Sequence, residues 1–107
     1  MNFRLIHAVA VASVLSTSAL AQVAAGDRPT DAEATVAWAK ADARMSLMPN
    51  DYSQKRVELG ECAKSQTGPG VICTAGVKVT PEAKPAYYVK LGFSKSASGE
   101  WVATFER

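Results

Sequence analysis

Two cysteines, Cys62 and Cys73, constrain the fold of this 107-residue chain more than any other feature. The residues between them include the segment 65–70 (SQTGPG), whose glycine and proline content is typical of a turn. The segments on either side have the composition of β-strands. We therefore expect the two cysteines to face each other across a hairpin. They could serve there as a reactive thiol with its partner, as half of a metal site, or as a disulfide.

The first residues decide between these chemistries, because they indicate the compartment. Arg4 gives a positively charged start, an apolar run follows over residues 5–15, and small residues lead to Ala21. This order is that of a secretory signal peptide, with cleavage after Ala21 and a second small-residue site at Ala25. The apolar run is shorter than the ~20 residues that cross a bilayer. Residues 1–21 are therefore expected to be removed.

Cleavage would leave 107 − 21 = 86 residues with a formal charge of 11 − 10 = +1, and it would remove His7, the one histidine. Without histidine, the usual Ser-His and Cys-His nucleophiles are excluded, and two cysteines supply only half of a structural zinc site. A disulfide remains, as expected for a small exported domain. We expect no metal, no cofactor, no nucleic-acid partner and no stable membrane anchor after cleavage.

The register of the first hairpin requires a bulge. Before the turn, Val57 and Leu59 are at odd-numbered positions and Cys62 is at an even-numbered one, so in a regular strand their side chains point to opposite faces. A regular ladder that paired the cysteines would therefore point Val57 and Leu59 away from the core. One extra residue at 60–61 restores the parity, and Gly60 suits such a position. The alternative is that Val57 and Leu59 precede the paired region. After the turn, the inward positions are Val71, Cys73, Ala75, Val77 and Val79.

A helix is expected over residues 31–48, with Thr30 as its N-cap. Thr30 and Glu33 have the spacing of a capping box, and Pro49 ends the helix. At 100° per residue the apolar side chains form two bands. The bulky band contains Ala34, Ala37, Trp38, Ala41, Met45 and Met48. The alanine-rich band contains Ala32, Val36, Ala39, Ala43 and Leu47. Polar residues separate the bands, and one of the two polar seams contains Asp31, Thr35, Asp42 and Ser46.

The second band bears on function. A helix that covers one sheet needs one apolar stripe, so the alanine-rich band is expected to contact a second copy of the chain or a partner protein. The competing interpretations are that alanine is present only as a good helix former, or that a curved sheet covers both bands.

Residues 86–93 and 100–106 are expected to form two further strands, joined by the polar loop 94–99. The predicted fold is therefore α+β, with one N-terminal helix packed across a four-stranded antiparallel meander and a disulfide-stapled first hairpin. Residues 22–29 are expected to be a flexible mature N-terminus, and residues 30–107 a single domain.

This order of elements resembles the general architecture of cystatin-like and other small exported proteins with a helix on a sheet. Gln54, Val57 and Gly60 do not have the spacing of the cystatin pattern Gln-x-Val-x-Gly, so the resemblance implies a fold and not protease inhibition. Residues 98–101 (SGEW) likewise depart from the Ser-Gly-x-x-Tyr pattern of exported bacterial lysozyme inhibitors.

Strand parity separates a core from an outer surface. Trp38, Met45 and Met48 are expected to pack on the sheet face that contains Val77, Tyr87, Val89, Leu91, Trp101 and Phe105. Tyr88 has the opposite parity and is expected on the outer face near Ile72, Thr74 and Val102. An aromatic residue among β-branched neighbours on a solvent-exposed face is typical of a binding patch, and the same residue types are also simply good strand formers.

Two functions remain open. The first is a small non-catalytic binding protein of the bacterial envelope, periplasmic or secreted, of the inhibitor, immunity or assembly-accessory type. Its partner would be another envelope protein or a peptide. The candidate contact residues are Tyr88, Ile72, Thr74, Val102, Val36, Ala43 and Leu47. The alternative is a small hydrolase that uses carboxylates alone, with Asp51, Glu58, Glu61 and Glu82 as candidates.

Overall fold

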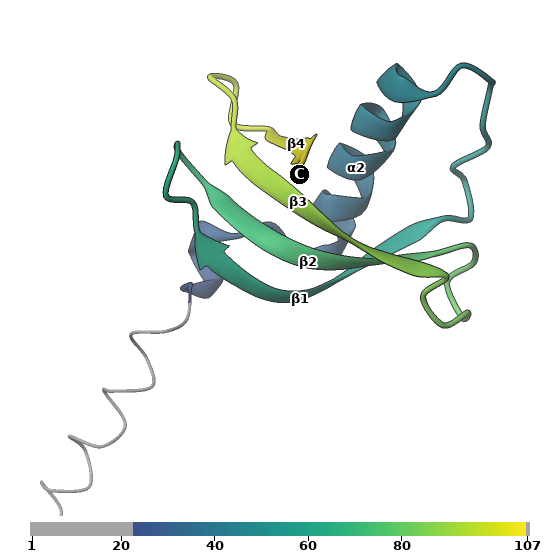
Figure 1. The fold of residues 1–107 in the computed structure, drawn as a ribbon, viewed down its shortest axis with the longest axis horizontal. Coiled ribbons are helices and arrows are strands. Elements are labelled where there is room, and N and C mark those ends of the chain that lie inside the picture. The colour runs from purple at the N-terminus through teal and green to yellow at the C-terminus, as the bar shows by residue number, and fades with distance from the viewer. Residues whose placement is uncertain (1–22, 107) are drawn as a thin grey trace, which may run out of the picture.

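The computed structural model describes residues 23–106 and shows one α-helix packed against a four-stranded antiparallel sheet (Figure 1). The elements are the 3-10 helix η1 (Ala25–Asp27), the helix α2 (Asp31–Met45), and the strands β1 (Arg56–Lys64), β2 (Val71–Lys78), β3 (Tyr87–Lys95) and β4 (Trp101–Phe105). The strands lie in the order β1-β2-β3-β4, which confirms the predicted α+β meander. The predicted signal peptide, residues 1–21, lies outside the described residues.

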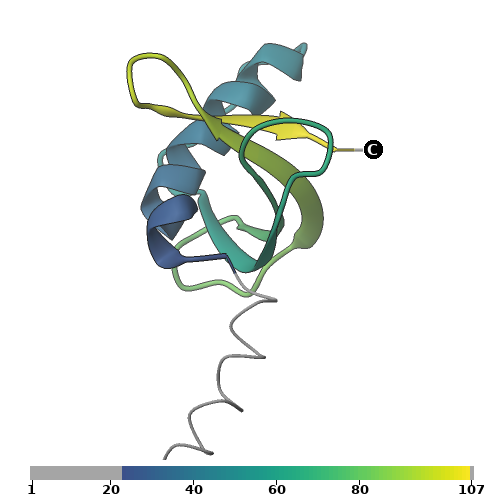
Figure 2. The same ribbon diagram turned by 90° about the vertical axis from the view of Figure 1, so that its left-hand side faces the viewer.

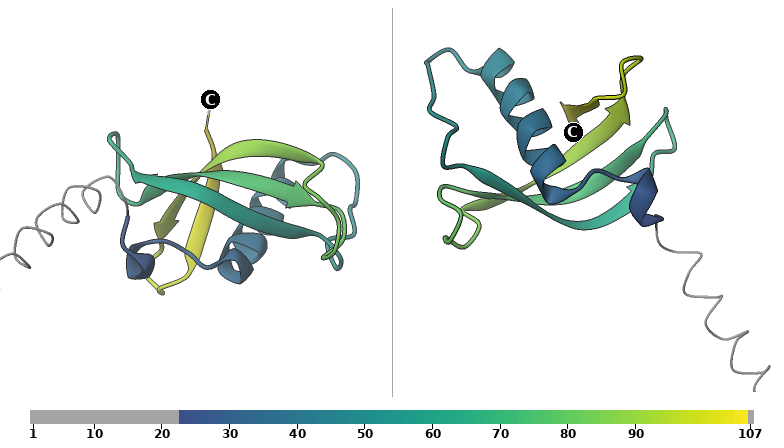
Figure 3. Two further views of the ribbon diagram at one scale, coloured as in Figure 1. Left: turned by 90° about the horizontal axis from the view of Figure 1, so that it is seen from below. Right: turned by 180° about the vertical axis from the view of Figure 1, so that it is seen from behind.

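The sheet is strongly curved, and α2 lies in its concavity between the two edge strands (Figures 1 and 2). The helix contacts β1 on one side and β4 on the other. Seen from below and from behind, η1 lies near the end of the sheet where β1 and β2 are joined (Figure 3). No helix within residues 23–106 is long and apolar enough to cross a membrane.

The first hairpin has the predicted bulge. Leu59 pairs with Ala75 and Cys62 pairs with Cys73, so Gly60 and Glu61 together face the single residue Thr74. The extra residue turns Val57 and Cys62 to the same face, and both are buried. The predicted disulfide between Cys62 and Cys73 is present, and it joins the two strands directly across the ladder with their Cα atoms 4.0 Å apart.

The helix begins where the sequence predicts and ends earlier. The Thr30 hydroxyl accepts a hydrogen bond from the Glu33 amide at 3.1 Å, and the Glu33 carboxylate accepts one from the Thr30 amide at 2.9 Å, which is a complete capping box. The predicted end at Met48 is wrong, because the last helical residue is Met45 and Ser46 is already extended. Proline disfavours the helical conformation in the residue before it, so Met48 cannot readily continue the helix.

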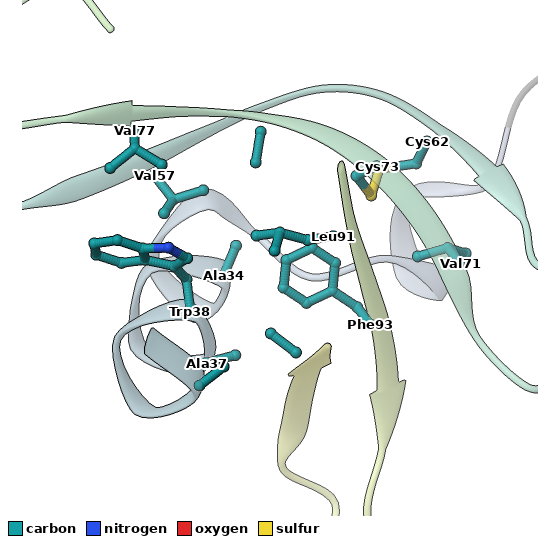
Figure 4. Packing of buried hydrophobic residues seen from close by; sticks show 13 residues of the cluster. Ala34, Ala37, Trp38, Val57, Cys62, Val71, Cys73, Val77, Leu91 and Phe93 are labelled. Atoms are coloured by element: carbon teal, nitrogen blue, oxygen red, sulfur yellow. A yellow bond between two sulfur atoms is a disulfide. The ribbon is translucent and has the colours of Figure 1, made fainter. Parts of the chain in front are cut away.

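The core lies between α2 and the concave face of the sheet (Figure 4). Trp38, Leu91 and Phe93 are almost completely buried, which confirms Trp38 as the anchor of the helix. The other two predicted anchors are wrong, because the side chains of Met45 and Met48 are 64% and 73% exposed. The remaining buried apolar residues are Ala34, Ala37, Ala41, Val57, Cys62, Val71, Cys73, Ala75, Val77 and Ala103.

An aromatic residue of the loop after α2 takes the place expected for the methionines. The ring of Tyr52 packs edge-on against Trp38, with 5.5 Å between the ring centroids. Its hydroxyl donates a hydrogen bond of 2.6 Å to the Asp42 carboxylate. Tyr87, predicted to be in the core, is 49% exposed because it is the first residue of β3 and lies at the end of the sheet. Trp101 is half-buried and packs against the core.

The segment before α2 also packs on the domain. Residues 22–29 are predicted to be a flexible terminus, and in the part of this segment that the structure describes Val23 packs against the core and Pro29 is buried. The 3-10 helix η1 lies between these two contacts.

Candidate binding surfaces

The outer face of the sheet carries a hollow of about 570 Å³. Three of its lining residues lie side by side on adjacent strands, because the bulge residue Glu61 faces Thr74, and Thr74 pairs with Lys90. Arg28 approaches from the segment before α2. The lining residues are Val23, Arg28, Glu61, Cys62, Ala63, Ile72, Thr74 and Lys90. The bulge that sets the cysteine register therefore also helps to shape this hollow.

The predicted outer patch does not form one site. Ile72 and Thr74 both line the hollow, whereas Tyr88 pairs with Gly76 and Val102 pairs with Ser94. Ser94 lies six positions after Tyr88 in β3, which is a distance of about 20 Å along an extended strand. Gly76, the partner of Tyr88, is two residues from Thr74 on β2, so Ile72, Thr74 and Tyr88 lie along one stretch of the outer face, whereas Val102 lies apart from Tyr88.

Tyr88 is 68% exposed, as predicted, and its ring lies over Gly76. A Cβ atom added to Gly76 would lie 3.1 Å from the Tyr88 ring and 2.9 Å from the Pro85 side chain. An aromatic ring that covers a glycine on the neighbouring strand stabilises a sheet. Tyr88 therefore has a structural role as well as an exposed surface.

The alanine-rich band of α2 lies between two shallow hollows. Ala32 and Val36 line one of about 460 Å³ toward β1 and another of about 420 Å³ toward β4. Val36 is 56% exposed, Ala43 is exposed and Ala39 is half-buried. Leu47, the fifth member of the band, lies beyond the end of the helix.

The strongest apolar exposure is found just after α2. Leu47 is 99% exposed, and Met45 and Met48 on either side of it are exposed as well. We call these three residues the apolar tip. With Val36, they make four of the seven large apolar side chains that are exposed within residues 23–106. The sequence does not predict the exposure of Met45 and Met48, because their helical spacing places them on the same side of the helix as the core residues.

Hydrogen bonds hold the loop that carries the apolar tip. The Ser46 hydroxyl donates to the Met48 carbonyl at 2.7 Å, and the Asn50 side chain donates to Ser46 at 3.4 Å. The Ser53 amide donates to Asp51 at 2.9 Å, and this bond is the main cause that lowers the pKa of the Asp51 carboxyl. The hydrogen bond to Asp42 is the main cause that raises the pKa of the Tyr52 phenol.

The four candidate carboxylates are divided among three segments of the chain. Glu58 and Glu61 are on β1, Asp51 is in the loop before it, and Glu82 is in the β2–β3 connection. Within residues 23–106, no three acidic, histidine or cysteine side chains form a group that could hold a metal ion.

Comparisons with known proteins give no relative for this chain. No protein-family model matches it, and neither the curated proteins nor the solved structures contain a match.

Proposed function

We propose that this protein is a small exported, non-catalytic binding protein of the bacterial envelope, and that it contacts another envelope protein or a peptide through the apolar tip. The observation that carries the proposal is the complete exposure of Leu47 beside the exposed Met45 and Met48. Contiguous apolar side chains on the surface of a small protein mark interaction sites, and methionine adapts its shape to a partner.

The loop supports this function because it is already ordered. Its serine, asparagine and aspartate side chains bond to the local backbone or to one another, and the Tyr52–Asp42 hydrogen bond ties the loop back to α2. A preformed loop loses less conformational entropy on binding than a flexible one. Val36 and Ala43 extend the contact surface along the outer side of α2, as expected from the sequence.

Two features support the proposed compartment. The sequence begins with the pattern of a signal peptide, and the cysteines form a disulfide within the domain. Disulfides persist in oxidising compartments such as the periplasm and the extracellular space. The binding partner is therefore expected in the envelope.

Retention of a partner on immobilised mature protein tests the proposal. We expect one envelope protein to be retained by the native sequence and lost with the double substitution Leu47→Ser and Met48→Ser. Val79→Ser is a matched control, because Val79 is 53% exposed in the connection after β2. All three proteins should unfold at the same temperature, since none of these side chains is buried. Equal retention by the double variant would contradict the role of the apolar tip.

A further inference from the structure

The hollow on the outer face of the sheet has a charge arrangement that points to a ligand of its own. Glu61 on β1 carries a negative charge, and Lys90 on β3 and Arg28 carry positive ones. Within residues 23–106, none of these three side chains makes an ion pair or a side-chain hydrogen bond. Opposite charges thus line one hollow without neutralising each other.

The sheet itself keeps these charges apart. Thr74 on β2 lies between Glu61 and Lys90, and neighbouring strands are about 4.8 Å apart, so the backbones of the two charged residues are roughly 10 Å apart. The Thr74 hydroxyl also makes no hydrogen bond within the described residues. The hollow therefore offers one acceptor carboxylate, two cationic donors and one hydroxyl that are all available to a ligand.

Apolar side chains also line the hollow, beside its polar groups. Ala63 and Ile72 face each other across β1 and β2 on the same face as Thr74, and both line the hollow. A volume of about 570 Å³ is within the range of small-molecule sites, which combine apolar walls with a few polar groups that fix orientation.

We propose that this hollow binds a small zwitterion with an apolar side chain, of the chemical class of a free aliphatic α-amino acid. Arg28 and Lys90 receive the carboxylate, Glu61 receives the ammonium group, and Ile72 contacts the apolar side chain. A ligand with both charges satisfies all three charged side chains, whereas a simple anion leaves Glu61 unpaired beside it. This inference is independent of the apolar tip, which lies in the loop after α2.

Calorimetric titration of the mature protein with three matched probes tests the proposal. The probes are leucine, isocaproate, which is leucine without its ammonium group, and isoamylamine, which is leucine without its carboxylate. We expect saturable binding of leucine at millimolar concentration and affinities about tenfold or more weaker for the two analogues, because each loses a charge-assisted contact. Absence of saturable leucine binding, or equal affinities for leucine and isocaproate, would overturn the proposal.

Variants assign the two ends of the ligand. Glu61→Gln should reduce the affinity for leucine to that for isocaproate and leave isocaproate binding unchanged. Lys90→Gln should weaken leucine and isocaproate by a similar factor and leave isoamylamine unchanged. Lys84→Gln is the control, since Lys84 is an exposed lysine of the β2–β3 connection that does not line the hollow. Unfolding temperatures report whether each variant is folded, and unchanged leucine binding in both folded variants would refute the assignment.

Discussion

The hydroxyl of Thr35 joins the helix to the edge of the sheet by accepting a hydrogen bond of 2.8 Å from the backbone amide of Val57. The same hydroxyl donates to the Asp31 carbonyl at 2.8 Å, one turn earlier in α2. The Asp31 carboxylate in turn accepts a hydrogen bond of 3.0 Å from the Leu59 amide. Two outward-facing amides of β1 are therefore bonded to the helix, which closes an edge that could otherwise pair with another strand.

Thr35→Val tests the importance of this connection. Valine has the shape of threonine without the hydroxyl, so the Val57 amide would lose its partner in a part-buried position. We expect the free energy of unfolding to fall by about 1–3 kcal/mol, measured by urea denaturation. Thr35→Ser keeps the hydroxyl and should recover most of the loss. If Thr35→Val were as stable as the native protein, the hydrogen bond would not hold the helix to β1.

Trp38 and Met45 should respond very differently to truncation. Trp38 is 1% exposed, and its buried indole Nε1 has no hydrogen-bond partner within residues 23–106, so its contribution comes from apolar burial. Trp38→Ala should cost about 3–5 kcal/mol, which could be most of the stability of so small a domain. Met45→Ala should leave the unfolding midpoint nearly unchanged. Similar losses for the two variants would mean that the helix is oriented differently.

The disulfide should be complete in the protein isolated from its native source and should stabilise it. Cys62 and Cys73 are eleven residues apart. A disulfide that closes a loop of this length lowers the conformational entropy of the unfolded chain, which adds about 3 kcal/mol to the free energy of unfolding. Alkylation of the denatured, unreduced protein should modify no thiol. Reduction should expose two thiols and lower the unfolding temperature. Alkylation of either cysteine without reduction would contradict the assignment.

Stability should decrease at alkaline pH. The pKa of Tyr52 is raised mainly by its hydrogen bond to Asp42, and that of Tyr87 mainly by burial. As the pH rises above about 10, the unfolded chain releases these phenol protons before the folded chain does. The free energy of unfolding therefore falls until the pH exceeds the raised pKa values of the folded chain. Tyr52→Phe should reduce this alkaline loss, measured as the unfolding temperature against pH. Tyr88→Phe, which changes an exposed phenol without a hydrogen bond, should keep the native profile.

The sequence predicts those parts of the fold that are determined by residues close together in the chain or by the two bonded cysteines. The capping box at Thr30 depends on residues three apart, and the bulge at Gly60 follows from the conflict of parity between Val57 and Cys62. The alternation of β2 places Cys73 and Val77 in the core. Each of these features is specified by neighbouring residues or by a covalent pair.

The parts that the sequence did not predict depend on where elements end and meet. A continuous helix would place Met45 and Met48 on the side that faces the core. The helix ends at Met45, however, and the side chain that packs on Trp38 is that of Tyr52. The sequence predicts the polar seam that contains Thr35, but it does not predict that this seam contacts β1. The outer hollow depends on the bulge and on Arg28, which lies far from Lys90 in the chain.

A photo-crosslinking amino acid at position 47 tests the central claim most directly. Leu47 is fully exposed, so the substitution should leave the fold intact. When the chain is produced in its source organism and irradiated, the proposed function predicts one adduct with an envelope protein, and no such adduct from a crosslinker at position 79. An adduct with a second copy of the chain would assign the apolar tip to a homodimer instead. The same adducts from both positions, or none from position 47, would contradict binding through the apolar tip.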